Sequence, residues 1–173
     1  ETAYRYWGDA LLLQGRKAES LDKFIDAIIN APYERLSRKG LTQWASHTGT
    51  RLYVPRMDLP YPGTVSGTQS SDLGAHQFAY QLARSHPYQP GQALMHEAQA
   101  IRAAMQALRQ GNENAGGMLA DLERLERNGM LEAYILFHRA TREIAAEYGA
   151  YLAQNRELLR RYWLEEVLRY AQN

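Results

Sequence analysis

The chain has 173 residues, of which 45% are hydrophobic, and its 20 basic and 19 acidic side chains give a net charge of +1. This balance excludes a function driven by overall electrostatic attraction to nucleic acid or to an anionic membrane. The chain has no cysteine and no run of about 18 apolar residues, which excludes disulfides, thiolate metal ligands and a membrane span. We expect a single domain whose core is large enough to fold without a metal.

Three helices are predicted at the start of the chain. Apolar residues recur at helical spacing over residues 2–14 and again over 17–31. Gly15 supplies the turn between these two helices, and Pro32 ends the second because proline has no amide proton to donate. A third helix is expected over residues 33–47.

Small and large residues follow a defined order along the first two predicted helices. The positions concerned are Tyr4, Trp7, Gly8, Leu11, Gly15, Ser20, Phe24, Ala27 and Pro32. This order resembles a tetratricopeptide (TPR) repeat, a helix-turn-helix unit of 34 residues. In this interpretation Trp7, Leu11 and Leu12 line one apolar face of the first helix. Gly8 and Ser20 are small where two helix backbones approach closely.

The resemblance spans residues 2–34 and implies an all-α fold, built of TPR-like helical hairpins in an α-α superhelix. It also implies a binding function, because hairpins of this kind present a helix face to a protein or peptide. Since a single repeat cannot bury its own apolar face, the later helices are expected to complete the core.

An irregular segment is predicted over residues 48–71, because prolines, glycines and small polar residues remove the helical period there. Residues 51–55 are β-branched and aromatic enough to predict a short extended segment or an edge strand. We expect residues 51–59 to be ordered and packed on the helices, and residues 66–71 to be mobile. The side chains expected to pack are Leu52, Val54, Met57 and Leu59.

Further helices are predicted after this segment, bounded by glycine, proline or asparagine. Their expected ranges are 72–85, 90–110, 116–128, 130–155 and 156–171. The fourth of these is either one long helix or two helices that join near Arg139. The chain as a whole is expected to form one helical domain, divided into residues 1–47, 48–71 and 72–173.

No catalytic or metal-binding spacing is found among the chemically reactive residues. The five histidines are His47, His76, His86, His96 and His138. No two of them have the spacing that places two metal ligands on one helix face. His96 and Glu97 begin a zinc-type motif, but Ala100 stands where the second histidine would be. Arg139 and Glu143 are expected to pair at i,i+4 on a solvated face. The sequence predicts no catalytic residue, no metal and no cofactor.

We therefore expect a non-catalytic, TPR-like protein that binds a protein or peptide, or a second copy of itself, and neither nucleic acid nor membrane. The residues expected to contact the partner are Tyr4, Arg5, Asp9, Leu12, Arg35, Arg38 and Lys39. The excess of arginine over lysine indicates a GC-rich, bacterial genome. Because the sequence starts at Glu1 without methionine, a removed leader or a truncated chain is expected, and both the cytoplasm and the periplasm stay open.

A small enzyme, either a hydrolase or a transferase, is the alternative. The segment 48–71 would then close over a pocket lined by His47, Asp58, His76 and Tyr80. This hypothesis requires these four side chains to converge in the tertiary structure, because catalytic geometry is spatial rather than sequential.

Overall fold

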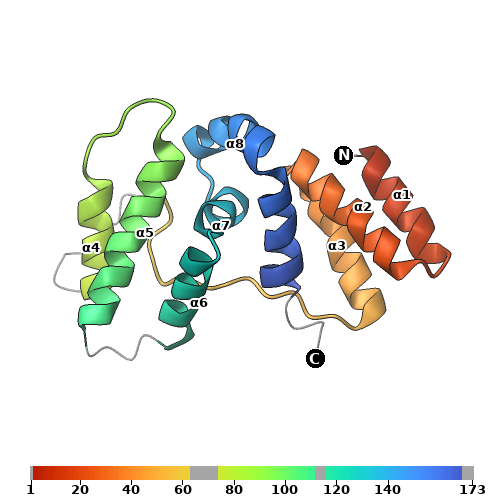
Figure 1. Cartoon of the computed structure of the whole chain (residues 1–173), viewed down its shortest axis with the longest axis horizontal. Coiled ribbons are helices and arrows are strands. Elements are labelled where there is room, and N and C mark those ends of the chain that lie inside the picture. Colours follow the sequence, from red (N-terminus) through yellow and green to blue (C-terminus); the bar gives the residue numbers. More distant parts are fainter. Residues whose placement is uncertain (1, 63–73, 112–115, 169–173) are drawn as a thin grey trace. The chain divides into compact units, whose positions relative to one another are not determined.

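The computed structural model describes residues 2–62, 74–111 and 116–168 (Figure 1). Within these ranges the chain forms eight α-helices and one π-helical turn, with no strand. The all-α prediction is therefore confirmed. The edge strand predicted at residues 51–55 does not form, and this segment has no regular secondary structure. None of the described helices is both long enough and apolar enough to cross a membrane.

The chain divides into two compact units, and the first of them contains both ends of the described chain. This unit comprises the described residues up to Val54 and from Leu152 onward. Its elements are α1 (Thr2–Leu13), α2 (Lys17–Asn30), α3 (Arg35–Thr48), the C-terminal part of α8 (Arg142–Arg161) and the π-helical turn η2 (Tyr162–Val167). The three N-terminal helices begin and end within two residues of their predicted bounds, because their apolar period is regular.

Phe24 lies at the centre of the packing among α1, α2 and α3. Its side chain is fully buried, and a Cβ atom at Gly8 would lie 2.7 Å from the ring. A Cβ atom at Gly40 would lie closer still to the same ring. Ser20 on α2 donates its hydroxyl hydrogen to the Gly8 carbonyl over 2.8 Å. This packing explains why α3 contains Gly40 in its middle, despite the low helix propensity of glycine.

Ion pairs attach the C-terminal residues to α2 within the first unit. Arg160 of α8 pairs with Asp22 and, over 3.1 Å, with Asp26. Residues 152–168 therefore belong with the N-terminal helices, whereas the predicted division placed them with the rest of residues 72–173.

The second compact unit comprises the described residues between Pro55 and Tyr151. Its elements are α4 (Ala75–Arg84), α5 (Ala93–Gln110), α6 (Gly116–Arg127), α7 (Leu131–His138) and the first part of α8. In this unit α4 and α5 pack along each other, as Figure 1 shows. Most of the α7 side chains are buried in its core, including Leu131, Ile135 and Leu136.

The last helices of the chain differ in part from their predicted ranges. The region 130–155 contains two helices that meet at residues 139–141, so the prediction of a join near Arg139 is confirmed. The boundary predicted between residues 155 and 156 is confirmed by a kink inside α8 at Asn155, where φ −128° and ψ 24° are not helical. The helix predicted from residue 156 is the second part of α8, and the chain continues from it into η2.

The irregular segment is held by hydrogen bonds at Pro55 and at Pro60. The Pro55 carbonyl accepts a hydrogen bond from the Tyr134 hydroxyl over 3.2 Å. The Pro60 carbonyl accepts one from the guanidinium of Arg139. Residues 55–62 are therefore fixed against helices of the second unit, as predicted for an ordered segment.

The side chains of this segment are buried to different degrees. Leu59 is buried, Leu52 and Met57 are half-buried, and Val54 is 39% exposed. The predicted packing is thus confirmed at Leu59 and wrong at Val54. The residues 66–71, predicted to be mobile, lie outside the described ranges.

Candidate functional site

One face of α1 is apolar and exposed to solvent. It carries Ala3, Tyr6, Trp7, Ala10 and Leu13, and we refer to these five residues as the α1 stripe. Tyr6 is 60% exposed, Trp7 53% and Leu13 90%. Together they expose on the order of 400 Å², which lies within the roughly 300–600 Å² of the largest apolar patch on a typical monomer, and such patches are often functional. No member of the stripe carries a charge.

The α1 residues predicted to contact a partner lie away from this stripe. Arg5 and Asp9 face each other over 3.7 Å with half-buried side chains, and Tyr4 is also half-buried. Leu12, predicted to contact a partner, is only 6% exposed, whereas Trp7, predicted to share one apolar face with Leu11 and Leu12, lies in the stripe. Both expectations were wrong because the two residues lie about 140° apart around the helix axis, and only the Leu12 side packs inward.

The basic residues predicted on α3 are partly available at the surface. Arg35 and Lys39 are exposed, and neither forms an ion pair with an acidic residue of the described chain. Arg38 is half-buried, with its guanidinium 5.9 Å from the ring centroid of Trp163. Lys39 lines an open hollow of about 500 Å³, whose other lining residues are Thr42, Gln43, Ser46 and His47.

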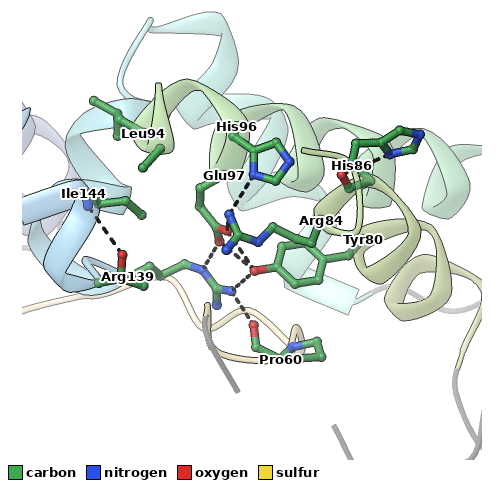
Figure 2. A network of polar contacts seen from close by, with 12 residues as sticks. Pro60, Tyr80, Arg84, His86, Leu94, His96, Glu97, Arg139 and Ile144 are labelled. Atoms are coloured by element: carbon green, nitrogen blue, oxygen red, sulfur yellow. Dashed lines mark hydrogen bonds and ion pairs between the residues drawn. The ribbon is translucent and has the colours of Figure 1, made fainter. Parts of the chain in front are cut away.

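A cluster of charged side chains is buried in the second unit (Figure 2). Glu97 on α5 is fully buried and accepts hydrogen bonds from the Tyr80 hydroxyl at 2.8 and 2.9 Å and from Arg139 Nε at 3.0 Å. Arg84 on α4 lies 3.5 Å from the same carboxylate and donates to His96 Nδ1 over 2.9 Å. The cluster therefore joins α4, α5 and the start of the α7–α8 connection through one carboxylate and two guanidinium groups.

The cluster shifts the protonation equilibria of its members. Burial raises the pKa of Tyr80 far above its ordinary value, and the Glu97 carboxylate raises it further. Burial alone would lower the pKa of Arg139, but Glu97 and Tyr80 together raise it. Burial and the charge of Arg84 lower the pKa of His96. Because Arg84 donates to Nδ1, the neutral His96 ring carries its hydrogen on Nε2.

A cavity of about 360 Å³ adjoins the cluster at the α4–α5 connection. His96 lines it, and the Tyr88 ring stacks on the His96 ring at a centroid separation of 4.4 Å. The other lining residues are Ala83, His86, Pro87, Gln92, Met95 and Gln99. No carboxylate lines this cavity, and the acidic group of the cluster is fully occupied by its partners. The groups that line the cavity and can exchange protons are the imidazoles of His86 and His96 and the phenol of Tyr88.

Most of this cluster was not predicted from the sequence. In the sequence, His96 and Glu97 stand out only as the start of a zinc-type motif that lacks its second histidine, and no metal was predicted there. Arg139 was expected to pair with Glu143 but binds Glu97, 42 residues away in sequence. In the sequence, the cluster is marked only by charged residues that stand among apolar residues at helical spacing.

The four residues of the enzyme alternative lie in different surroundings. His47 is exposed on α3 in the first unit, and the other three belong to the second. Asp58 is 82% exposed at its side chain and lies 4.0 Å from His76. The Tyr80 hydroxyl is buried against Glu97. The structure thus brings Asp58 and His76 together and directs Tyr80 into the charged cluster.

Comparison of the chain with protein-family models, with curated proteins and with solved structures finds no match.

Proposed function

We propose that this protein is a non-catalytic, TPR-like interaction module, bacterial in origin, that binds a protein partner through its first unit. The observation that carries the proposal is the α1 stripe, because a soluble protein rarely leaves two aromatic rings and a leucine exposed on one helix face without a partner. Aromatic residues are also the side chains most enriched at the centres of protein interfaces.

The packing of the first three helices supports the TPR-like part of the proposal. Gly8, Ser20 and Phe24 stand at the positions of the sequence pattern, and they mediate the close contact of α1 with α2. The contact of Phe24 with Gly40 extends the same type of packing to α3. The helices α1 and α3 both pack on the buried ring of Phe24, which belongs to α2. Such packing is consistent with the start of a helical superhelix.

Trp7 of the stripe is oriented by a contact with α2. The Lys23 ammonium on α2 lies 4.2 Å from the ring centroid of Trp7, within the range of a cation–π contact. A side chain that is already oriented loses less conformational entropy on binding. The exposed Arg35 and Lys39 on α3 provide additional contacts for an acidic partner.

Affinity capture with the purified protein, from an extract of its source organism, tests the proposal. We expect a specific partner to be retained by the wild type and by Val54→Ser, which alters an exposed apolar residue outside the stripe. The double substitution Trp7→Ser with Leu13→Ser is expected to abolish retention while leaving the helical circular dichroism unchanged. An identical set of retained proteins for this double variant and the wild type would overturn the proposal.

A further inference from the structure

The cavity at the α4–α5 connection has, in its wall, a buried hydrogen-bond donor without an acceptor. This donor is Nε2 of His96, a residue that is 6% exposed and whose Nδ1 accepts from Arg84 over 2.9 Å (Figure 2). Nε2 forms no hydrogen bond within the described part of the chain, although backbone groups of Ala83 and His86 lie near the ring. A buried donor without an acceptor is destabilising, and an oxygen atom of a ligand would supply the acceptor.

The charged cluster beside this cavity contains more positive than negative charge. Among the described residues, Glu97 is the only carboxylate within ion-pair distance of Arg84 or Arg139. Arg139 Nε donates to Glu97 over 3.0 Å, whereas Arg84 lies 3.5 Å from this carboxylate and donates to the neutral imidazole of His96. One carboxylate therefore faces two guanidinium groups, and Arg84, on the side of the cavity, is the less neutralised of the two.

Within residues 74–111 and 116–168, no other carboxylate neutralises this charge at the cavity. None of the residues that line the cavity is acidic. The charge of Arg84 also acts on Glu143, but Glu143 is exposed on α8 and adjacent to the exposed Arg142. Glu147 is bound by the first amides of α5. The cavity therefore has a positive potential, which favours an anionic ligand.

The walls of the cavity suit a small, flat molecule. The Tyr88 ring stacks on the imidazole with the ring centroids 4.4 Å apart, and Pro87 and Met95 add apolar surface. Aromatic rings and a thioether make favourable contacts with a further aromatic ring. The volume of about 360 Å³ lies near the lower end of the roughly 300–1,000 Å³ of ligand pockets, so the ligand is small.

We propose that this cavity binds a small aromatic carboxylate. The ring of the ligand packs against Tyr88, Pro87 and Met95, and its carboxylate accepts from His96 Nε2 and offsets the excess charge of Arg84. Because Nε2 is closed to solvent, the exposed side chains of Tyr88 and Met95 adjust as the ligand enters. The site belongs to the second unit and goes beyond the function proposed for the α1 stripe, so either proposal can fail without the other.

Titration of the isotope-labelled full chain, followed by amide NMR, tests the inference with three probes of similar shape. Benzoate is anionic, benzamide is neutral and benzylamine is cationic. We expect benzoate to bind saturably with a Kd near or below about 1 mM, and to shift the amides of residues 86–99 most. Benzamide is expected to bind about three- to tenfold more weakly because it carries no charge, and benzylamine is expected not to bind.

Gln99→Glu tests the charge preference without altering a buried residue, because Gln99 lines the cavity and is exposed. The added carboxylate should weaken benzoate binding by about three- to tenfold and should allow benzylamine to bind. Gln106→Glu is the matched control, since Gln106 is exposed on the same helix and does not line this cavity. Gln106→Glu should change the affinity for benzoate by less than about twofold, because the two positions are about two helical turns apart and salt screens the added charge.

Two substitutions of Arg84 separate its charge from its contribution to packing. Arg84→Lys retains the positive charge and should keep the preference for benzoate over benzamide, whereas Arg84→Gln should lose this preference. If Arg84→Gln does not fold, Arg84→Lys and the two glutamine variants still decide the question.

Four outcomes would overturn the inference. The first is no saturable binding of benzoate up to about tenfold above the expected Kd. The second is equal affinity for benzoate and benzamide, which would remove the role of charge. The third is benzoate shifts that lie outside residues 83–99, which would place the bound molecule elsewhere. The fourth is an equal effect of Gln99→Glu and Gln106→Glu on benzoate binding.

Discussion

The backbone of Gly40 on α3 lies directly against the ring of Phe24 on α2, with no space for even a methyl group between them. Phe24 is fully buried, so its ring cannot move aside without disturbing its other neighbours. Glycine, which disfavours a helix more than any residue except proline, is therefore required in the middle of α3.

This contact predicts that Gly40→Ala destabilises the protein. We expect the free energy of unfolding in urea to fall by about 1–3 kcal/mol, because overpacking outweighs the better helix propensity of alanine. Gly149 is the matched control, since it is also helical and a Cβ there would meet nothing within 4 Å. Gly149→Ala should raise the unfolding free energy by up to about 1 kcal/mol. Stabilisation by both substitutions would contradict the packing at Gly40.

The buried charged cluster predicts a graded response to substitution. Glu97→Gln would leave the buried guanidinium of Arg139 without its counter-charge, and we expect a loss of about 3–5 kcal/mol in unfolding free energy. Tyr80→Phe removes the hydroxyl that donates to the Glu97 carboxylate and accepts from Arg139 Nη2 over 3.0 Å, and it should cost about 1.5–3 kcal/mol. Equilibrium denaturation of both variants measures these values.

The control for this series is the surface pair of Arg109 with Glu123, whose Nε to Oε1 contact of 2.9 Å is of the same kind but whose side chains are 51% and 35% exposed. Glu123→Gln is expected to change the unfolding free energy by less than about 1 kcal/mol. A loss for Glu97→Gln as small as for Glu123→Gln would show that the buried cluster contributes no stability.

The contact between Arg84 and His96 predicts loss of stability on acidification. Burial and the charge of Arg84 lower the pKa of His96 in the folded state below its value in the unfolded chain. The unfolded chain then binds the proton more readily, so the contribution is fully present above the unfolded pKa of about 6.5 and decreases as pH falls below it. Protonation would also place two hydrogen-bond donors, His96 Nδ1–H and the Arg84 guanidinium, against each other.

Unfolding measured between pH 7.5 and pH 5 checks this dependence. His96→Gln keeps an oxygen that accepts from Arg84 but does not titrate, so its stability should change less with pH than that of the wild type. The other four histidines are common to both proteins, and their effects cancel in the comparison. Equal pH dependence in the two proteins would exclude His96 as the cause.

A carboxylate of α8 caps the start of α5 and predicts a further stability effect. The backbone amides of Ala93 and Leu94 donate to Glu147 over 2.6 and 3.2 Å. Because a helix N-terminus leaves amide groups unpaired and carries partial positive charge, we expect Glu147→Ala to cost about 1–2 kcal/mol. Glu147→Gln should retain part of the stabilisation, because its amide oxygen still accepts a hydrogen bond. Faster hydrogen exchange at the amides of Ala93 and Leu94 in Glu147→Ala is the direct readout. Unchanged exchange in Glu147→Ala would contradict the cap.

The sequence by itself determined the helices and the positions at which they meet closely. Helical periodicity depends on residues three and four apart, so α1 and α2 follow from local pattern, whereas the same pattern left one long helix or two with a join near Arg139 as alternatives. The small and large residues around Phe24 also indicated a close helix contact before its partners were known. These features can be predicted because helix formation depends on residues that are close together in the chain.

Only the tertiary structure decided which helix faces meet solvent and which charges are buried together. Trp7 and Leu12 lie on the same helix and are both apolar, and only packing distinguishes the exposed one from the buried one. Arg139 has an acidic residue within reach along its own helix pattern, yet it binds Glu97 on α5. A buried carboxylate requires a close counter-charge far more than an exposed one does, and burial results from contacts between segments distant in sequence.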